Sequence, residues 1–221
     1  MSRILIKISG KYIEDAESKG DFSVFEWIAS SLVGLSRNQE IAVVIGGGKM
    51  PKRYSTLGAV PRDYIGMMGT IMNAIALRER IPNAVIFSAV EIPQVCRRDA
   101  VGEASSIMSA GSIPIFAGGL GYPCFSTDTL AVIKAVELKC ETVVKATRVN
   151  GVYDKNPDLH SDAKFLPSLS YTDAMSKGII DKTAVIIAEQ HGVKVICCML
   201  SPENIRFCPN FPVASIIKGI A

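Results

Sequence analysis

The apolar run Ile-Ala-Val-Val-Ile at residues 41–45 constrains the fold most strongly, because every side chain in it must leave water. A strand with one solvent-facing side alternates apolar and polar residues, whereas this run is apolar at every position. It is therefore typical of a strand covered on both faces, as in a parallel sheet between two layers of helices. Three consecutive glycines follow directly, so the chain is expected to turn sharply at the strand's carboxyl end.

The rest of the chain alternates between strand-like and helix-like runs, which predicts an α/β protein. Further strands are expected at residues 3–8, 84–87, 113–116, 142–146 and 193–199. Helices are expected at residues 22–35, 62–80, 127–138 and 183–191, with another after Ser201-Pro202. Residues 154–169 contain two prolines and are predicted to form the one long loop, a length that is often functional.

Composition excludes several classes of protein. Hydrophobic residues make up 48% and charged residues 20%, which is incompatible with a disordered chain. The net charge of +3 is too small to predict nucleic-acid binding. The longest uncharged stretch, residues 104–127, is broken throughout by Gly, Ser and Pro, and the N-terminal apolar run is shorter than a signal-peptide core. We therefore expect neither a membrane partner nor secretion.

The six cysteines show no Cys-x-x-Cys spacing, which argues against a zinc site or a disulfide framework. Cys197 and Cys198 stand in an apolar run and are expected to be buried as small core residues. Reduced thiols of this kind predict a cytoplasmic protein.

Three glycine turns follow predicted strands: KISG at 7–10, GGGK at 46–49 and AGGLG at 117–121. Glycine at a strand's carboxyl end lets backbone N–H groups approach a phosphate, and a helix that follows adds its positive end. Tight turns also need glycine, so a single turn is weak support, but three on one sheet edge predict an anion site. The spacing matches neither a P-loop nor a dinucleotide-binding fingerprint.

Four polar side chains elsewhere in the chain allow both a functional and a structural interpretation. Asp128 could be a partner of a helix dipole, and Asp181 could form a surface ion pair with Lys182. Asp63 could decorate the first turn of a helix, and Asn156 could cap the turn before the proline that follows it.

Two lysines carry a stronger signal. Lys7 precedes a glycine turn, and Lys145 lies within a predicted apolar strand, where a lysine is costly without a partner. Phosphoryl transfer needs positive charge and in-line placement rather than a base. His160 and His191 lie in a loop and beside a helix-ending glycine, so both are expected to face solvent.

Seven motifs occur in order along the chain: KISG at 7–10, IGGG at 45–48, RDYIGM at 62–67, STD at 126–128, KATRVNGVY at 145–153, LSY at 169–171 and IDKTA at 180–184. Together they resemble the bacterial UMP kinase (uridylate kinase) branch of the amino acid kinase family. The resemblance covers nearly the whole chain and implies a single domain, residues 1–221, folded as a three-layer αβα sandwich around a mainly parallel sheet. Its N-terminal part would form mainly the acceptor site and its C-terminal part mainly the ATP site.

The resemblance also implies an activity: transfer of the γ-phosphoryl group of Mg-ATP to UMP by a homohexamer, in pyrimidine nucleotide biosynthesis. Mg²⁺ would be carried by the ATP phosphates, with no direct protein ligand. Lys7, Asp128 and Asp181 would be catalytic. ATP-binding positions would be Lys7, Ser9, Gly10, Gly48, Lys52, Lys145, Thr147, Tyr153 and Asn156.

The positions implied for UMP are Gly47, Asp63, Leu120, Gly121, Tyr122, Pro123, Cys124, Phe125, Ser126 and Thr127. Asp63 would hold the ribose, and the segment 120–127 would wrap the nucleotide. Where the family pattern has Arg, Thr, Asn, Asp and Asp, this chain has Lys52, Leu120, Tyr122, Asn150 and Asn156. These departures bear on nucleotide preference and regulation, whereas Lys7, Asp128 and Asp181 follow the pattern.

Two alternative functions remain open at this point. One is a kinase of the same fold that acts on a carboxylate or carbamate, which would need basic residues for the acceptor. The other is a non-catalytic relative that binds nucleotides or oxoanions. The RDYIGM segment disfavours the first, and the presence of the lysine and both aspartates disfavours the second.

Overall fold

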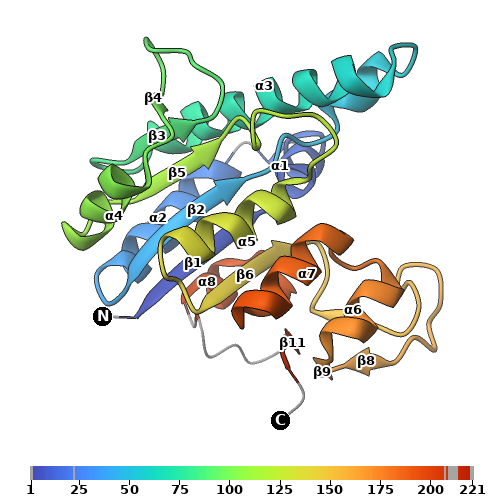
Figure 1. Cartoon of the computed structure of the whole chain (residues 1–221). Coiled ribbons are helices and arrows are strands. Elements are labelled where there is room, and N and C mark those ends of the chain that lie inside the picture. The colour runs from blue at the N-terminus through green and yellow to red at the C-terminus, as the bar shows by residue number, and fades with distance from the viewer. Residues whose placement is uncertain (1, 22, 207, 209–213, 220–221) are drawn as a thin grey trace.

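The structure, a computed structural model of the chain, describes residues 2–21, 23–206, 208 and 214–219. Its central sheet has nine strands in the order β4-β3-β5-β2-β1-β6-β10-β11-β9 (Figure 1). All neighbouring strands run parallel except the antiparallel pair β10 and β11. The strands are β1 (Arg3–Ile8), β2 (Glu40–Ile45), β3 (Val85–Ser88), β4 (Arg97–Arg98), β5 (Pro114–Ala117), β6 (Thr142–Thr147), β9 (Ser168–Leu169), β10 (Lys194–Met199) and β11 (Ser215–Ile217).

Helices cover both faces of this sheet, which confirms the predicted three-layer α/β architecture (Figure 1). One face carries α1 (Gly10–Glu17), α2 (Val24–Ser36), α3 (Ala59–Arg78) and α8 (Pro202–Arg206). The other carries α4 (Val101–Ser109), α5 (Thr127–Glu137), α6 (Tyr171–Lys177) and α7 (Lys182–His191). A 3₁₀ helix, η1 (Met50–Tyr54), precedes α3, and β7 (Val152–Tyr153) pairs with β8 (Phe165–Leu166) in a separate antiparallel hairpin.

The sheet divides the core into two hydrophobic clusters, one under each helix layer. On β1, Ile4, Ile6 and Ile8 face the α2–α3 side, while Leu5 faces the α5 side. The two-residue period of a strand places Lys7 on that same α5 side. In β2, residues 41–45 are all buried, as the uninterrupted apolar run predicts.

Within the described residues, three helices and five short strands were not predicted: α1, α4 and α6, and β4, β7, β8, β9 and β11. The eight-residue α1 is too short to show a helical period. Helix α4 contains glycine and several serines, which weaken its helical pattern in the sequence. In the structure the Ser106 hydroxyl donates to the carbonyl of Gly102 within this helix. The prediction that 154–169 is a plain loop is wrong, because β8 and β9 lie within it.

Element ends also differ slightly from the predictions. Helix α3 begins at Ala59, three residues before the predicted start, so Asp63 does not lie in the first turn. Phe22, the predicted start of the next helix upstream, lies outside the described residues. Of the helices in the described ranges, none is both long and apolar enough to cross a bilayer.

Candidate active site

The carboxyl ends of β1, β2, β5 and β6 lie at one edge of the sheet, and each is followed by a segment that lines the candidate site. Open parallel sheets bind ligands at this edge, where helix N-termini and exposed backbone N–H groups gather. Helix α5 also begins there, with Ser126 as its N-cap.

Lys7, Lys145 and Asp128 form a mostly buried cluster, called here the lysine cluster. Lys7 and Lys145 are direct register partners on the parallel strands β1 and β6, so their side chains emerge side by side. Asp128, in the first turn of α5, lies 3.0 Å from Lys7 Nζ and 2.5 Å from Lys145 Nζ. Lys145 also donates to the carbonyl of Ile179 at 2.7 Å. The predicted need of Lys145 for a partner is thereby met.

Electrostatics keep the Asp128 carboxylate ionised. Burial raises the pKa of Asp128, but the ammonium groups of Lys7 and Lys145 outweigh that effect and lower it to about 2. The cluster thus carries two positive charges and one negative charge, and the remaining positive charge is available to an anion. Asp128 is more than the helix-dipole partner that the sequence alone allowed.

Asp181 is tied to hydroxyl and amide groups. As the N-cap of α7 it accepts from the backbone N–H of Ala184 at 3.1 Å. Its other oxygen accepts from Thr129 Oγ1 at 2.5 Å and from Ser126 Oγ. Burial raises the pKa of Asp181, and these hydrogen bonds bring the net value below its usual range. Within the described residues Asp181 forms no ion pair, either with Lys182 or with the lysine cluster.

A cavity of about 350 Å³ lies on the β2–β5 side of the lysine cluster, and we call it the acceptor cavity. Five of the ten residues predicted for UMP line it: Gly47, Asp63, Phe125, Ser126 and Thr127. Gly48, predicted for ATP, lines it as well. The remaining lining residues are Pro51, Gly66, Met67, Thr70 and Gly119, of which Gly66 and Met67 belong to the RDYIGM motif.

Two hydrogen bonds across the acceptor cavity fix its walls. Asp63 on α3 accepts from the backbone N–H of Cys124 at 2.7 Å, so it anchors the segment predicted to wrap UMP. Thr70, about two turns further along the same face of α3, accepts from the N–H of Gly118 at 2.7 Å and donates to the Met67 carbonyl. The sequence did not single out Thr70, because a buried threonine within a helix gives no motif.

The other five predicted UMP positions are not on the wall of the acceptor cavity. Leu120 packs against the core under α5, and Gly121 lies near Ala89. Tyr122 is 71% exposed, and Pro123 and Cys124 follow it along the same surface loop. Cys124 takes part through its backbone N–H alone.

A second cavity, of about 240 Å³, lies on the β6–β10 side, and we call it the donor cavity. Three predicted ATP positions line it: Ser9, Lys145 and Thr147. Its other lining residues are Arg148, Val149, Gly151, Ile179 and Cys197. Burial raises the pKa of Cys197 to about 11, so this thiol is neutral, in line with its prediction as a small core residue.

Six predicted ATP positions are not on the donor cavity wall: Lys7 of the lysine cluster, Gly10 and Gly48 of the glycine turns, and Lys52, Tyr153 and Asn156. Tyr153 packs edge-on against Phe165, with ring centroids 5.6 Å apart. Asn156 is exposed, and its side-chain oxygen accepts from the N–H of Asp158 at 3.0 Å, which is the turn-capping role that the sequence allowed. Lys52 is exposed on η1.

The remaining predicted groups are the first glycine turn, the histidines and the cysteines. Gly10 lies against the backbone of the triple-glycine turn, so closely that a Cβ there would stand 2.1 Å from the Gly46 carbonyl oxygen. His160 and His191 are exposed, as predicted. All six cysteines are free, and five of them, Cys124 being the exception, are buried.

The sequence is similar to those of known proteins along most of its length. The sequence profile of the amino acid kinase family matches residues 2–199. A uridylate kinase of Campylobacter jejuni is 36% identical over 215 residues, covering 91% of this chain and 90% of that protein. A uridylate kinase of Campylobacter concisus is 37% identical over 209 residues, covering 89% and 88%. A uridylate kinase of Wolinella succinogenes is 36% identical over 218 residues, covering 92% and 90%.

Solved structures show the same fold. A UMP kinase from Bacillus anthracis superposes with a TM-score of 0.86 at 25% identity, covering all of this chain and 97% of that one. A UMP kinase from Ureaplasma parvum gives a TM-score of 0.88 at 23% identity, covering 98% of each chain. The predicted three-layer architecture is therefore confirmed by independent structures.

Proposed function

The chain belongs to the amino acid kinase family, and on that premise we propose that it transfers the γ-phosphoryl group of ATP to UMP, giving UDP and ADP. The observation that carries the proposal is the position of the lysine cluster between two cavities. Lys145 lines the donor cavity, and Asp128 follows directly on Thr127 of the acceptor cavity. Two nucleotides whose phosphates meet at such a cluster would be placed for in-line transfer.

The reaction forms one bond and breaks one bond. A phosphate oxygen of UMP attacks the γ-phosphorus of ATP, and the bond between that phosphorus and the β–γ bridging oxygen breaks. The electron pair of the broken bond stays on ADP. Because the UMP phosphate is already an anionic nucleophile, no base is needed, which suits a site without histidine.

Lys7 and Lys145 would supply the positive charge that the transferred group needs. The equatorial oxygens carry most of the negative charge in the transition state, and fixed ammonium groups in a water-poor site stabilise it without reorganising. Asp128 would hold both lysines in place through its ion pairs. Asp181 would act more remotely, by fixing Ser126 and Thr129 and through them the start of α5.

The remaining substrate contacts are proposed from the family resemblance. Asp63 and Gly47, with the segment 120–127, would bind UMP. Ser9, Gly10, Gly48, Lys52, Thr147, Tyr153 and Asn156 would bind ATP, with the open loop around Tyr153 and Asn156 nearest the adenosine end.

Magnesium is proposed to enter with ATP, bound by phosphate oxygens. Mg²⁺ prefers oxygen ligands and often keeps one or two carboxylates beside substrate phosphates. Within the described residues no group of three His, Cys, Asp or Glu side chains could hold a metal. Asp128 is committed to two lysines, and Asp181 to three donors. When bound, the metal would neutralise phosphate charge.

We also propose a homohexamer in the cytoplasm. Helix α3 presents an apolar stripe at four-residue spacing: Val60, Tyr64, Met68 and Met72 are 37–56% exposed. Residues four apart share one helix face, and a continuous exposed apolar face favours association with another copy. Light scattering should give the hexamer mass, and Met68→Glu with Met72→Glu should reduce it. The free thiols suit a reducing compartment.

A coupled ADP-release assay with UMP, CMP, glutamate and aspartate as acceptors tests the activity. The proposal expects turnover with UMP and little with either amino acid. Turnover with glutamate or aspartate would assign the carboxylate-kinase alternative. No turnover with any acceptor, combined with nucleotide binding by calorimetry, would assign the non-catalytic alternative.

A further inference from the structure

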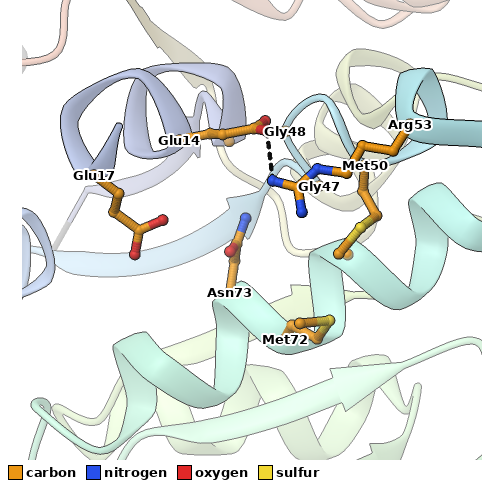
Figure 2. Close-up of a pocket in the computed structure, with 10 residues that line it drawn as sticks. Glu14, Glu17, Gly47, Gly48, Met50, Arg53, Met72 and Asn73 are labelled. Carbon is orange, nitrogen blue, oxygen red and sulfur yellow. Dashed lines mark hydrogen bonds and ion pairs between the residues drawn. The ribbon is translucent and has the colours of Figure 1, made fainter. Parts of the chain in front are cut away.

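A third cavity, of about 240 Å³, lies between α1 and α3 on the far side of the triple-glycine turn (Figure 2). Gly47 and Gly48 line this α1–α3 cavity and also line the acceptor cavity. The triple-glycine turn is therefore a wall one residue thick between the α1–α3 cavity and the acceptor cavity. Whatever holds the wall from the α1 side also sets its position on the substrate side.

Glu14 holds this wall with both of its carboxylate oxygens. One oxygen accepts from the backbone N–H of Lys49, the residue that ends the turn. The other accepts from Arg53 Nη2 at 3.1 Å, so η1 is bound to the same side chain. Figure 2 shows Glu14 reaching from α1 toward the turn, with Arg53 directed back to it. Because Arg53 faces Glu14, its guanidinium is engaged on the side of the turn away from the acceptor cavity.

The backbone at this point is crowded and unusual. Gly48 has φ = +74°, a conformation that glycine adopts readily, and a Cβ there would stand 2.8 Å from Glu14 Oε2. Asp15, the next residue on α1, pairs with the side chain of Lys49 and lies 3.3 Å from Arg148 Nη1. Two consecutive carboxylates of α1 thus hold Lys49 by its backbone and by its side chain.

We propose that Glu14 is a positioning residue for phosphoryl transfer. The proposal rests on the proposed function, in which Gly47 faces UMP and Gly48 faces ATP. Glu14 touches neither substrate; it fixes the turn that lies between them. Its negative charge is matched by Arg53, so it supports the turn with little repulsion toward phosphates. Loosening the turn would misalign donor and acceptor together, so the turnover rate suffers more than either Michaelis constant.

Three variants of Glu14 and one control variant distinguish the effect of side-chain length at position 14 from the effect of its negative charge. Glu14→Ala removes both contacts, and Glu14→Asp keeps the charge but withdraws it by one methylene. Glu14→Gln keeps the length and an acceptor oxygen but loses the charge. Glu17→Ala is the matched control, because Glu17 lines the same cavity one turn later on α1 and, among the described residues, its carboxylate accepts no hydrogen bond from the turn.

The expected order of kcat is wild type, then Glu14→Gln within about threefold, then Glu14→Asp and Glu14→Ala about tenfold lower or more, as for one lost hydrogen bond to a charged group. The KM values for UMP and ATP should change by less than about threefold. Amide hydrogen exchange should show the Lys49 N–H exchanging about tenfold faster in Glu14→Ala and unchanged in Glu17→Ala.

Two results would overturn the role of Glu14. One is an unchanged exchange rate at Lys49 in both Glu14→Ala and Glu14→Asp. The other is a reversed order, with Glu14→Asp near wild type and Glu14→Gln impaired, because charge rather than reach would then matter. Exchange does not depend on turnover, so a wild-type chain that is inactive with UMP would refute the proposed function separately.

Discussion

Replacing Asp128 with asparagine removes one negative charge and almost no volume from the lysine cluster. Lys7 and Lys145 are only 12% and 13% exposed at their side chains, so both would remain in a water-poor place without an anion. An unpaired buried charge is strongly unfavourable, because its hydration is lost and nothing replaces it. We expect Asp128→Asn to fold less stably and to turn over more slowly.

The structure sets the size of the loss of stability. Lowering the pKa of Asp128 from 3.8 to about 2 corresponds to about 2 kcal/mol in favour of the ionised carboxylate. Removing one partner of a buried pair costs about 3–5 kcal/mol in other proteins. The loss in unfolding free energy should lie near the lower of these two values, the one from the pKa of Asp128. An amide oxygen at position 128 can still accept from one lysine, and the site keeps some contact with solvent. We therefore expect a loss of about 2–3 kcal/mol in unfolding free energy.

Urea unfolding followed by the fluorescence of Trp27, the single tryptophan, measures this loss. Trp27 lies half-buried on α2 against Tyr12, so its emission reports the folded core. Adding Lys145→Met to Asp128→Asn removes one of the two unpaired charges and should recover part of the stability. Asp128→Asn within about 0.5 kcal/mol of wild type, the scatter of surface substitutions, would refute the electrostatic account.

We also expect the difference in unfolding free energy between wild type and Asp128→Asn to depend on pH. A carboxyl group whose folded pKa is lowered contributes stability above its unfolded pKa of 3.8 and loses that contribution as the pH falls through its folded value of about 2. The difference between wild type and Asp128→Asn should therefore be constant above about pH 5 and shrink between pH 4 and pH 2. A difference that stays constant down to pH 2 would show that Asp128 is not ionised and paired as the distances indicate.

Three further substitutions test the proposed substrate contacts by steady-state kinetics and calorimetry. Lys7→Ala should lower kcat by about 10²–10³ with little change in UMP affinity, since a charge that meets the transition state is lost; near-normal kcat would remove Lys7 from the mechanism. Asp63→Asn should raise the KM for UMP and leave that for ATP nearly unchanged, because charge-assisted hydrogen bonds to the ribose are weakened while Cys124 N–H keeps an acceptor; equal changes in both would indicate a general defect of the fold. Asn156→Asp should lower the KM for ATP by at most about tenfold, the difference between neutral and charged hydrogen bonds; an unchanged KM would leave residue 156 as a turn cap alone.

Six of the nine strands of the central sheet could be predicted, because burial on both faces leaves a plain pattern, whereas the short strands β4, β9 and β11 could not. Residues 41–45, which are apolar at every position, lie in β2, and Val143, Val144 and Ala146 are the apolar residues of β6. Helix α4 could not be predicted, because its glycine and serines give a weak period and only contact with the sheet decides its structure. Local pattern therefore indicates the elements that carry the core and misses short elements that the core holds in place.

The candidate site divides in the same way. The unusual lysine within a strand indicated that Lys145 needs a partner, and the sequence offered Asp128 as a catalytic residue without showing that the two meet. The contact of Asp63 with the N–H of Cys124 joins residues 61 positions apart, and no local pattern reports a backbone donor at such a distance. Glu14 was missed for a related reason, since its partners are a backbone N–H and a side chain on the next turn of the site.

Asp128 and Asp181 show how environment assigns different tasks to like residues. Both stand near the start of helices, α5 and α7, and the pKa of each is lowered against the effect of burial. For Asp128 the cause is two ammonium groups, so this carboxylate sets the charge of the cluster that we propose meets the phosphates. For Asp181 the cause is hydrogen bonds from Ser126, Thr129 and Ala184, none of them charged, so this carboxylate joins α5 to α7. An incoming phosphoryl group is an anion and can satisfy the positive charge left over at Lys7 and Lys145, but it cannot replace the bonds that Asp181 accepts. In the proposed reaction the substrate would therefore balance the charge of the cluster that Asp128 belongs to, while Asp181 holds the start of the helix that carries Asp128 whether or not substrate is bound.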